Sequence, residues 1–238
     1  MNLAIDIGNT NIKAAVFNGE GLIEVCLQQA ELNGLLSKYP IENAIISKTG
    51  DNTEIEHKLQ GMDIKVAHLT KELSLPIEIL YKTPHTLGAD RVAGSIAANA
   101  EFRSQPVLKI DFGTCITYDV INADNQYLGG AISPGMMMRF KALNSYTAKL
   151  PLIDPMQFTQ YELTGSDTAS SIASGVVNGI KNEVEGIIND YNQRFGSLKV
   201  LATGGDCGLF VTLIKSEIFA RPYLVLQGLN HILNHNLK

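Results

Sequence analysis

The sequence predicts an α/β fold built from two similar halves, and three observations support this prediction. An acidic turn between strand-like segments occurs twice: residues 3–13 read LAIDIGNTNIK and residues 108–119 read LKIDFGTCITYD. Each turn opens a run of three short strands that is followed by helices and further strands. A break near residues 103–106 separates the halves without a long linker. We therefore expect two domains, residues 1–105 and 106–238, whose mixed sheets are flanked by helices and which enclose a cleft.

The first half starts with three short strands separated by turn-forming residues. Short turns favour antiparallel neighbours, so these strands are expected to pair in chain order. A helix, a strand, a polar helix, another strand and a helix rich in small residues follow. The expected strands are 2–6, 12–18, 21–27, 43–48 and 63–69, and the expected helices are 30–38, 52–60 and 89–102.

The second half repeats this order. Three strands come first, with a hairpin turn at residues 122–125, and a helix follows Pro134-Gly135. A long helix is expected over residues 166–190, broken or softened by its three glycines, because glycine is a poor helix former. The remaining elements are strands 106–111, 115–122, 127–132 and 198–203, and a C-terminal helix over 224–235 with apolar residues at helical spacing.

Composition limits the function classes. Of 238 residues, 45% are hydrophobic and 18% charged, which is typical of a globular protein. The net charge is −5 without a run of Lys or Arg, so a nucleic-acid partner is not expected. Three scattered cysteines fit a reducing compartment. Neither a secretion signal nor an apolar stretch of membrane-spanning length is present, so we expect a soluble cytoplasmic protein without a membrane partner.

The two acidic turns suggest a phosphate site that includes a cation. Gly8 and Gly113 allow the backbone to approach an anion closely, and turns of this kind direct N–H groups at phosphate. Asp6 and Asp111 would repel phosphate unless a metal ion lies between, and Mg²⁺ prefers one or two carboxylates together with phosphate oxygens. The alternative for a single such turn is a plain Asx-turn at a strand end, but two copies favour a clamp on a nucleotide phosphate.

A third glycine turn follows a strand in the second half. Residues 202–206 read ATGGD and precede a helix. Bare backbone at paired glycines can pack against an adenine or a ribose. A simple strand–helix connection explains the same residues equally well.

These motifs, taken together, resemble the type III pantothenate kinases of the actin-like ATPase superfamily. The matching segments keep the family order and span almost the whole chain, and the GADR element followed by DxGT is the most specific of them. They are residues 6–13 (DIGNTNIK), 87–91 (LGADR), 111–119 (DFGTCITYD), 129–135 (GGAISPG), 164–175 (TGSDTASSIASG) and 203–205 (TGG).

The resemblance implies a fold and an activity. The fold would be a pair of ribonuclease H-like domains, as in actin-like ATPases. The activity would be phosphorylation of pantothenate by ATP, the first step of coenzyme A synthesis. The resemblance also implies a homodimer, magnesium with ATP, and a monovalent cation, either potassium or ammonium.

Substrate-side roles follow from the resemblance residue by residue. Asp90 matches the proposed general base, although an Asp at a helix N-terminus is also explained by the helix dipole. Arg91 could bind a carboxylate or phosphate, or form a structural ion pair. Thr168 could hold substrate or cap the long helix. The implied substrate-binding residues are Tyr81, Gly88, Ala89, Asp90, Arg91 and Thr168.

Nucleotide-side roles also follow from the resemblance. Asp6 is expected to position magnesium through water, and Asp111 matches the ligand of the monovalent cation. Lys13 would neutralise phosphate charge if it points inward, whereas a strand lysine usually faces solvent. The implied ATP-binding residues are Asp6, Ile7, Gly8, Asn9, Thr10, Asn11, Lys13 and Thr114.

Two other functions remain open at this point. A non-catalytic regulatory relative of the family would share the motifs. A kinase for another small alcohol would share the phosphate turns. The intact acidic residues argue against the first alternative, and the GADR element argues against the second.

Overall fold

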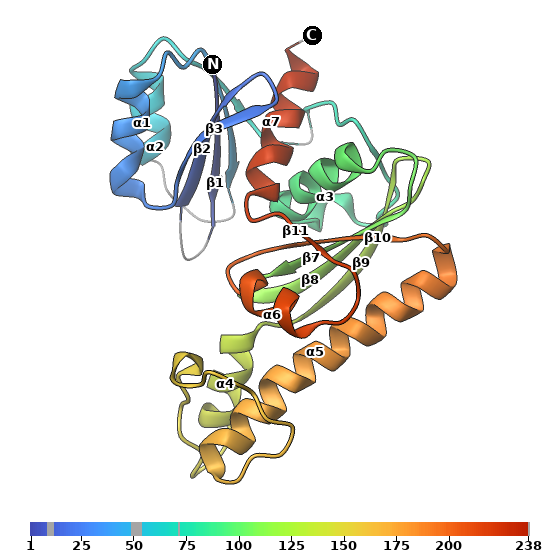
Figure 1. Ribbon diagram of the computed structural model, residues 1–238. Coiled ribbons are helices and arrows are strands. Elements are labelled where there is room, and N and C mark those ends of the chain that lie inside the picture. The colour runs from blue at the N-terminus through green and yellow to red at the C-terminus, as the bar shows by residue number, and fades with distance from the viewer. Residues whose placement is uncertain (9–11, 49–53, 71, 238) are drawn as a thin grey trace. The chain divides into compact units, whose positions relative to one another are not determined.

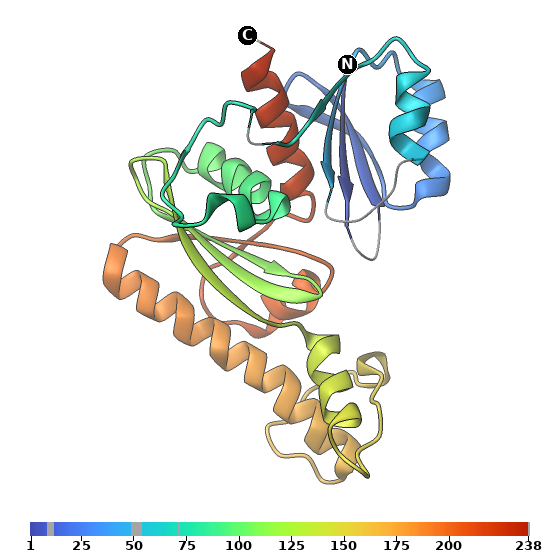
Figure 2. The ribbon, with the colours of Figure 1, turned by 180° about the vertical axis from the view of Figure 1, so that it is seen from behind.

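The computed structural model describes residues 1–8, 12–48, 54–70 and 72–237 (Figures 1 and 2). Contacts divide the chain into two compact units. The first unit consists of Met1–Gln105, Val120–Gly129 and Tyr223–Lys238, and the second of Pro106–Asp119 and Gly130–Pro222. The division after residue 105 coincides with the predicted domain break. The assignment of residues 1–105 and 106–238 to separate domains remains a prediction.

Among its described residues, the first unit holds a five-stranded sheet and four α-helices. Most elements lie within two residues of their expected bounds, and the expected start of α2 lies outside the described residues. The elements are β1 (Asn2–Ile7), β2 (Ile12–Asn18), β3 (Gly21–Cys26), α1 (Leu32–Lys38), β4 (Asn43–Lys48), α2 (Glu54–Gln60), β5 (Lys65–His68), β6 (Glu78–Ile79), α3 (Ala89–Glu101) and α7 (Leu224–Asn236), with 3₁₀ turns η1 (Gln29–Glu31) and η2 (Pro84–Thr86).

The strand order in this sheet is β3-β2-β1-β4-β5. The pairs β1–β2 and β2–β3 are antiparallel, as the short turns predict. The pairs β1–β4 and β4–β5 are parallel, because helices connect those strands. The ends of β1 and β4 therefore lie at the same edge of the sheet, next to the first acidic turn.

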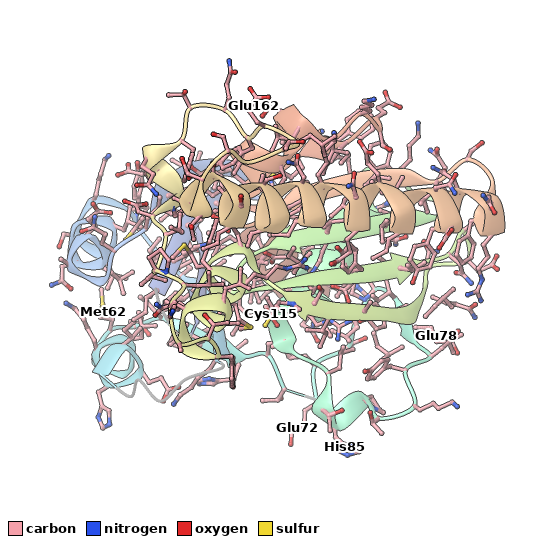
Figure 3. All side chains as sticks on the ribbon, turned by 90° about the horizontal axis from the view of Figure 1, so that it is seen from below. Met62, Glu72, Glu78, His85, Cys115 and Glu162 are labelled. Carbon is pink, nitrogen blue, oxygen red and sulfur yellow. The ribbon has the colours of Figure 1, made fainter. Side chains whose placement is uncertain are left out.

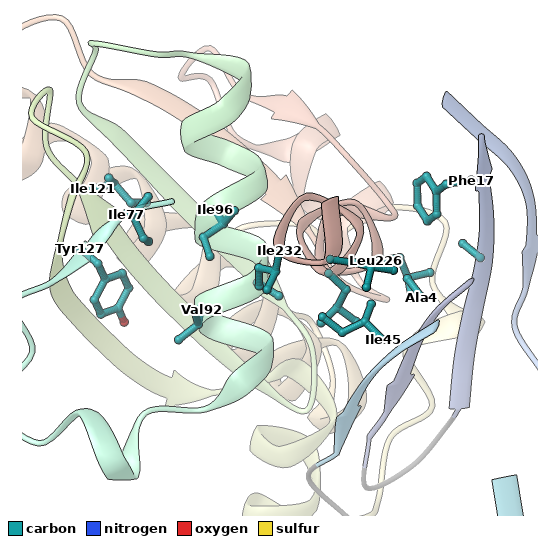
Figure 4. Close-up of a cluster of buried hydrophobic side chains, with 14 residues drawn as sticks. Ala4, Phe17, Ile45, Ile77, Val92, Ile96, Ile121, Tyr127, Leu226 and Ile232 are labelled. Carbon is teal, nitrogen blue, oxygen red and sulfur yellow. The ribbon is translucent and has the colours of Figure 1, made fainter. Parts of the chain in front are cut away.

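Alternation along β1 divides the core of this unit into two clusters. Leu3, Ile5 and Ile7 point to the face covered by α1 and α2, where they pack with leucines of both helices. Ala4 points to the opposite face, which belongs to the cluster that contains α7 and α3. Figure 4 shows α7 between the sheet and α3. Small residues such as Ala4 allow this helix to lie close to the strands.

An asparagine network fixes the direction of α7. Asn2 Nδ2 donates to Asn230 Oδ1 at 3.0 Å and to Asn234 Oδ1 at 2.7 Å. Asn230 Nδ2 then donates to the Gly19 carbonyl at 2.8 Å, in the turn between β2 and β3. Because Asn2 and Asn230 are buried, these bonds satisfy amide groups that would otherwise be costly to bury.

The second unit contains most of a six-stranded sheet, ordered β11-β10-β7-β8-β9-β6, in which β6 and the paired ends of β8 and β9 belong to the first unit. Helices α5 and α6 pack on it, and Phe112 stacks on Phe210 of α6 with ring centroids 5.0 Å apart. The elements are β7 (Val107–Phe112), β8 (Cys115–Ile121), β9 (Gln126–Pro134), α4 (Met136–Ser145), η3 (Pro155–Gln157), α5 (Thr168–Phe195), β10 (Lys199–Thr203), α6 (Cys207–Leu213) and β11 (Phe219–Ala220).

The expectation that glycines break the long helix is wrong. Helix α5 runs for 28 residues without interruption, through Gly175, Gly179 and Gly186. A side chain added at any of these glycines would meet no atom within 4 Å. Burial of an apolar stripe along α5 outweighs a cost of about 1 kcal/mol per glycine. Among the described residues, no helix has both the length and the apolar character needed to cross a membrane.

Contact between α7 and α3 yields a stability prediction. A Cβ at Gly228 would lie 1.8 Å from the Ala93 carbonyl oxygen, so the two helices cannot keep their separation in a Gly228→Ala variant. We expect this change to lower the free energy of unfolding by about 3 kcal/mol or more. Urea denaturation followed by circular dichroism measures the difference.

Gly175→Ala is the matched control, because it places the same methyl group on an exposed helix face. We expect it to raise stability by about 0.5–1 kcal/mol. Equal stability of the two variants would contradict the close packing of α7 on α3.

Candidate functional site

The described part of the first acidic motif, Asp6 to Gly8, lies at the edge of the sheet where β1 and β4 both end. Asp6 is half-buried near the end of β1 and lies opposite Lys13 in the antiparallel register with β2. Opposed residues of an antiparallel pair point to the same face, so the lysine accompanies the carboxylate. Ile7 is buried and anchors the strand end, and Gly8 follows it. The expected ligands Asn9, Thr10 and Asn11 lie outside the described residues.

Helix α3 begins at the GADR element. Gly88 precedes the helix in an extended conformation, and Asp90 is its second residue. A Cβ at Gly88 would lie 2.5 Å from Asp90 Oδ1, so the carboxylate folds back over the glycine. Ala89 is half-buried beside it, and the Arg91 side chain is 6% exposed. A carboxylate at a helix N-terminus and a buried guanidinium therefore stand on adjacent residues.

Tyr81 is held by a glycine from a distant segment. Gly129 has a φ of +112°, and a Cβ there would lie 3.2 Å from Tyr81 Cδ2. The ring of Tyr81 also meets Tyr127 edge-on, with centroids 6.2 Å apart. Because two contacts fix the ring, Tyr81 is a positioned side chain rather than a mobile surface residue.

In the second unit, β7 ends at the other acidic turn. Asp111 is half-buried, and a Cβ at Gly113 would lie 3.3 Å from its Oδ1. Gly204, which has a φ of +97°, would place a Cβ 2.5 Å from the same oxygen and 2.5 Å from the Phe112 backbone. The TGG turn after β10 therefore packs directly on this acidic turn. Thr114 follows, exposed, before β8 begins.

A buried ion pair lies on the same sheet face as Asp111. Lys109 Nζ is 2.7 Å from Asp119 Oδ2, and the two side chains are 1% and 0% exposed. Lys109 precedes Asp111 by two residues, so both point to one face of the strand. Thr203 lies opposite Asp111 on β10 and is also buried. These buried polar side chains share one face of the sheet, whose other buried residues are mainly apolar.

The electrostatics near Asp111 follow from burial. Burial, together with the nearby Asp111 charge, raises the pKa of the Cys207 thiol to about 11. Burial also raises the pKa of Asp206, at the start of α6. The raised pKa values show that a negative charge on Cys207 or Asp206 is disfavoured. Surroundings of this kind favour a cation or a neutral group next to Asp111.

Thr168 is the first residue of α5, but it does not cap the helix. The cap is Asp167, whose carboxylate accepts from the Ser170 N–H at 2.8 Å, and a capping box is present. Thr168 is exposed at the end of α5 that lies beside α4, away from the sheet of this unit (Figures 1 and 2). The capping interpretation of Thr168 is therefore wrong, and its hydroxyl remains a candidate for ligand binding.

Sequence reasoning missed the Lys109–Asp119 pair and the side chains that support segment 111–114. A lysine inside the apolar run VLKIDF was the available signal for a buried charge, because strand interiors rarely hold one without a partner. In the first unit, His231 Nδ1 lies 2.8 Å from Glu20 Oε2. Across the described ranges, no group of three or more His, Cys, Asp or Glu is arranged to hold a metal ion.

Each unit therefore offers a distinct set of groups. The first provides a carboxylate and a lysine at a strand end, and an Asp–Arg pair at a helix N-terminus. The second provides a half-buried carboxylate within a glycine-lined turn. Such groups suit a phosphorylated ligand together with a cation, because Mg²⁺ takes one or two carboxylates together with phosphate oxygens.

Comparison with known proteins agrees with this chemistry. Residues 2–190 match the family model described as type III pantothenate kinase. A type III pantothenate kinase of Phocaeicola vulgatus is 44% identical over 249 residues, with 100% of both chains covered. One from Cytophaga hutchinsonii is 41% identical over 240 residues, again with 100% of both chains covered.

Solved structures support the fold. A Campylobacter jejuni protein described as a Baf family transcriptional activator superimposes with a TM-score of 0.63 at 21% identity, covering 99% of this chain and 98% of that one. A glucokinase from an Antarctic psychrotroph gives 0.53 at 13% identity, covering 99% and 98%. The expected α/β fold of paired ribonuclease H-like domains is confirmed. The family-model match and the sequence relatives show that this chain belongs to the type III pantothenate kinase family.

Proposed function

We infer that this chain transfers the γ-phosphoryl group of ATP to the primary hydroxyl of pantothenate, the first step of coenzyme A biosynthesis. The observation that carries this inference is the match over the full chain, at 35–44% identity, to curated relatives that are all named type III pantothenate kinase. The geometry of the candidate residues agrees with phosphoryl transfer, in which positioning and charge stabilisation provide most of the catalysis.

Asp90 is proposed to orient the acceptor hydroxyl and to take its proton late in the reaction. Its place on the first turn of α3 makes the side chain rigid, because the carboxylate lies against Gly88. Little negative charge is needed on the attacking oxygen of a loose transition state, so a weak base suffices.

Arg91 is proposed to bind an anionic group of the substrate. Burial of this guanidinium in the first turn of α3 strengthens any charge-assisted hydrogen bond that it makes. Tyr81 is proposed to contact pantothenate, and the backbones of Gly88 and Ala89 to border it. The exposed Thr168 is proposed to offer its hydroxyl to the same substrate.

ATP binding is proposed to use both acidic turns. In the first unit, Lys13 lies opposite Asp6 and would neutralise phosphate charge, while Asp6 would hold Mg²⁺ through water. Contacts with ATP are also proposed for the remaining residues of this segment, which are Ile7, Gly8, Asn9, Thr10 and Asn11. In the second unit, Thr114 would contact a phosphate. Kinases that use ATP bind it together with a divalent metal ion. A single carboxylate together with phosphate oxygens is a ligand set that suits Mg²⁺.

Asp111 is proposed to bind a monovalent cation, potassium or ammonium. The carboxylate is half-buried, and the neighbouring Cys207 thiol is held neutral, since its pKa is raised to about 11. An oxygen ligand in such surroundings favours a bound cation, because the charge would otherwise be poorly solvated.

A homodimer is proposed through the region around α4. Unusually many large apolar side chains are exposed there, which is typical of a protein interface. Glu162 projects outward from the same region, before α5 (Figure 3). The exposed apolar residues are Ile132, Met137, Met138, Tyr146, Leu152, Met156 and Leu163. The cytoplasm is the proposed location, and the three free cysteine thiols support it, since they suit a reducing compartment.

The activity is tested with the Asp90→Asn variant, which removes the charge with little change of shape. We expect the wild type to release ADP when pantothenate is present, and the variant to be slower by about 10²–10⁴. Product identification by mass spectrometry completes the measurement. A regulatory relative would release no ADP, and a kinase for another alcohol would not respond to pantothenate.

Asp63→Asn is the control for charge, because Asp63 is exposed on the same unit. We expect it to keep the wild-type rate. If Asp90→Asn also keeps full turnover and differs in unfolding free energy by about 1 kcal/mol, Asp90 serves the helix dipole instead of the reaction.

Cation dependence is tested with Asp111→Asn. We expect the wild type to be faster in potassium than in sodium by on the order of tenfold, equivalent to about 1.4 kcal/mol. The variant should lose this difference, because the carboxylate that binds the cation is gone. Asp124→Asn, in the exposed hairpin turn, should retain it. A wild type indifferent to the two ions would refute the proposal.

The homodimer is tested by replacing Met156 and Leu163 with glutamate. Their side chains are 87% and 80% exposed, so the change should spare the fold of one chain. Sedimentation velocity should show a dimer for the wild type and a monomer for the double variant. Ile23→Glu, on the first unit, should remain dimeric. A monomeric wild type at micromolar concentration would be the contrary result.

A further inference from the structure

Glu183 receives hydrogen bonds from two elements of the second unit. Its Oε1 accepts from the Tyr118 hydroxyl of β8 at 2.8 Å. Its Oε2 accepts from Arg139 Nη2 of α4 at 2.6 Å. Glu183 lies in the middle of α5, so one carboxylate joins the sheet, the short helix and the long helix.

Arg139 uses the rest of its guanidinium to hold the end of β9, just before α4. Its Nε donates to the Pro134 carbonyl at 2.8 Å, and Nη2 donates to Ser133 Oγ at 2.8 Å. The rigid planar fork of arginine allows these bonds to form together with the bond to Glu183. The result is a fixed junction between β9 and α4 at residues 133–135.

This junction packs against the second acidic turn. The Gly135 N–H donates to the Thr114 carbonyl at 3.1 Å. A Cβ at Gly135 would lie 2.3 Å from the Gly113 carbonyl oxygen and 2.5 Å from the Thr114 carbonyl oxygen. The two backbones are therefore in contact, and a displacement of residues 133–135 would displace Thr114.

Charge keeps this arrangement intact at neutral pH. Burial would raise the pKa of Glu183, but hydrogen bonds from Arg139, Tyr118 and Ser133 outweigh it and hold that pKa below 4.5. Burial, together with the Glu183 charge, raises the pKa of Tyr118 far above its ordinary value. The stabilisation by Glu183 is thus present above pH 4.5 and is lost as the pH falls through the lowered pKa.

We propose that Arg139, held by Glu183, is a positioning residue for nucleotide binding that fixes Thr114 through the junction of β9 and α4 at residues 133–135. The proposal rests on the proposed function, in which Thr114 contacts an ATP phosphate. Arg139 itself need not touch the nucleotide. It acts by limiting the freedom of the backbone that does, so its loss weakens binding of ATP more than binding of pantothenate.

The experiment compares Arg139→Gln, Arg139→Lys and Ser133→Ala with the wild type. For Arg139→Gln we expect the KM for ATP to rise by about tenfold to a hundredfold, with the KM for pantothenate within about twofold of wild type. Arg139→Lys should recover part of the loss, since lysine keeps the charge near Glu183 but lacks the fork. Ser133→Ala should have a smaller effect of the same kind.

Nucleotide binding without pantothenate gives a second readout. Calorimetric titration with a non-hydrolysable ATP analogue and Mg²⁺ should show weaker binding by Arg139→Gln. This measurement does not depend on which acceptor the enzyme uses. Failure of the wild type to phosphorylate pantothenate would overturn the proposed function and leave this readout to decide the role of Arg139.

The chain offers a matched control in the first unit. Glu24 accepts from Tyr39 Oη at 2.6 Å and forms an ion pair with Lys38, which is the same combination of tyrosine, carboxylate and cation. Lys38→Gln should leave both KM values unchanged. The proposal is overturned if Arg139→Gln and Ser133→Ala bind the analogue as tightly as the wild type. It is also overturned if Lys38→Gln weakens binding equally.

Discussion

Close contact of backbone on backbone at glycine is the constraint on which the candidate site of the second unit depends. Gly204 and Gly135 both approach segment 111–114 to distances at which no Cβ fits. Backbone contacts of this kind have few alternative arrangements, because no side chain can rotate to relieve them. The carbonyl and N–H groups of the acidic turn are therefore fixed before any ligand arrives, which is what phosphoryl transfer requires of a site that works by positioning.

The first unit reaches the same rigidity by a different route. Helix α7, the last element of the chain, lies between the sheet and α3, and the contact of Gly228 with Ala93 fixes their separation. Because α3 starts at Ala89, the position of Asp90 depends on a helix more than 130 residues later in the sequence. Buried asparagines select the register of α7 on β1, so packing and polar specificity act on the same element.

The local sequence pattern predicted most helices and strands well, but it could not predict contacts between residues far apart in the sequence. The bounds of β1, β2 and β4, and the antiparallel order of the first three strands, follow from alternation and turn residues. The apolar spacing of α7 showed that one face is buried, but not that α3 and the first sheet bury it. Continuity of α5 through three glycines required knowledge of its tertiary contacts, since propensity alone favours a break. The pairing of Lys109 with Asp119 depends on strand register, which a single sequence does not specify.

The same reasoning explains why the motif residues were easier to find than their supports. Asp6, Asp90 and Asp111 belong to short motifs that can be recognised from the sequence. A carboxylate close to a glycine is unusual within or next to an apolar strand, so it indicates a functional role. Arg139 and Glu183 are 44 residues apart and each looks like an ordinary surface charge on a helix. Their role can be recognised only in the fold, which brings both side chains to Tyr118 and to the junction of β9 and α4 at residues 133–135. Under the proposed function, a turn that holds both a carboxylate and a phosphate must keep its shape against charge repulsion. The partly buried ion pair of Arg139 and Glu183 would provide this support without placing another charge on the nucleotide.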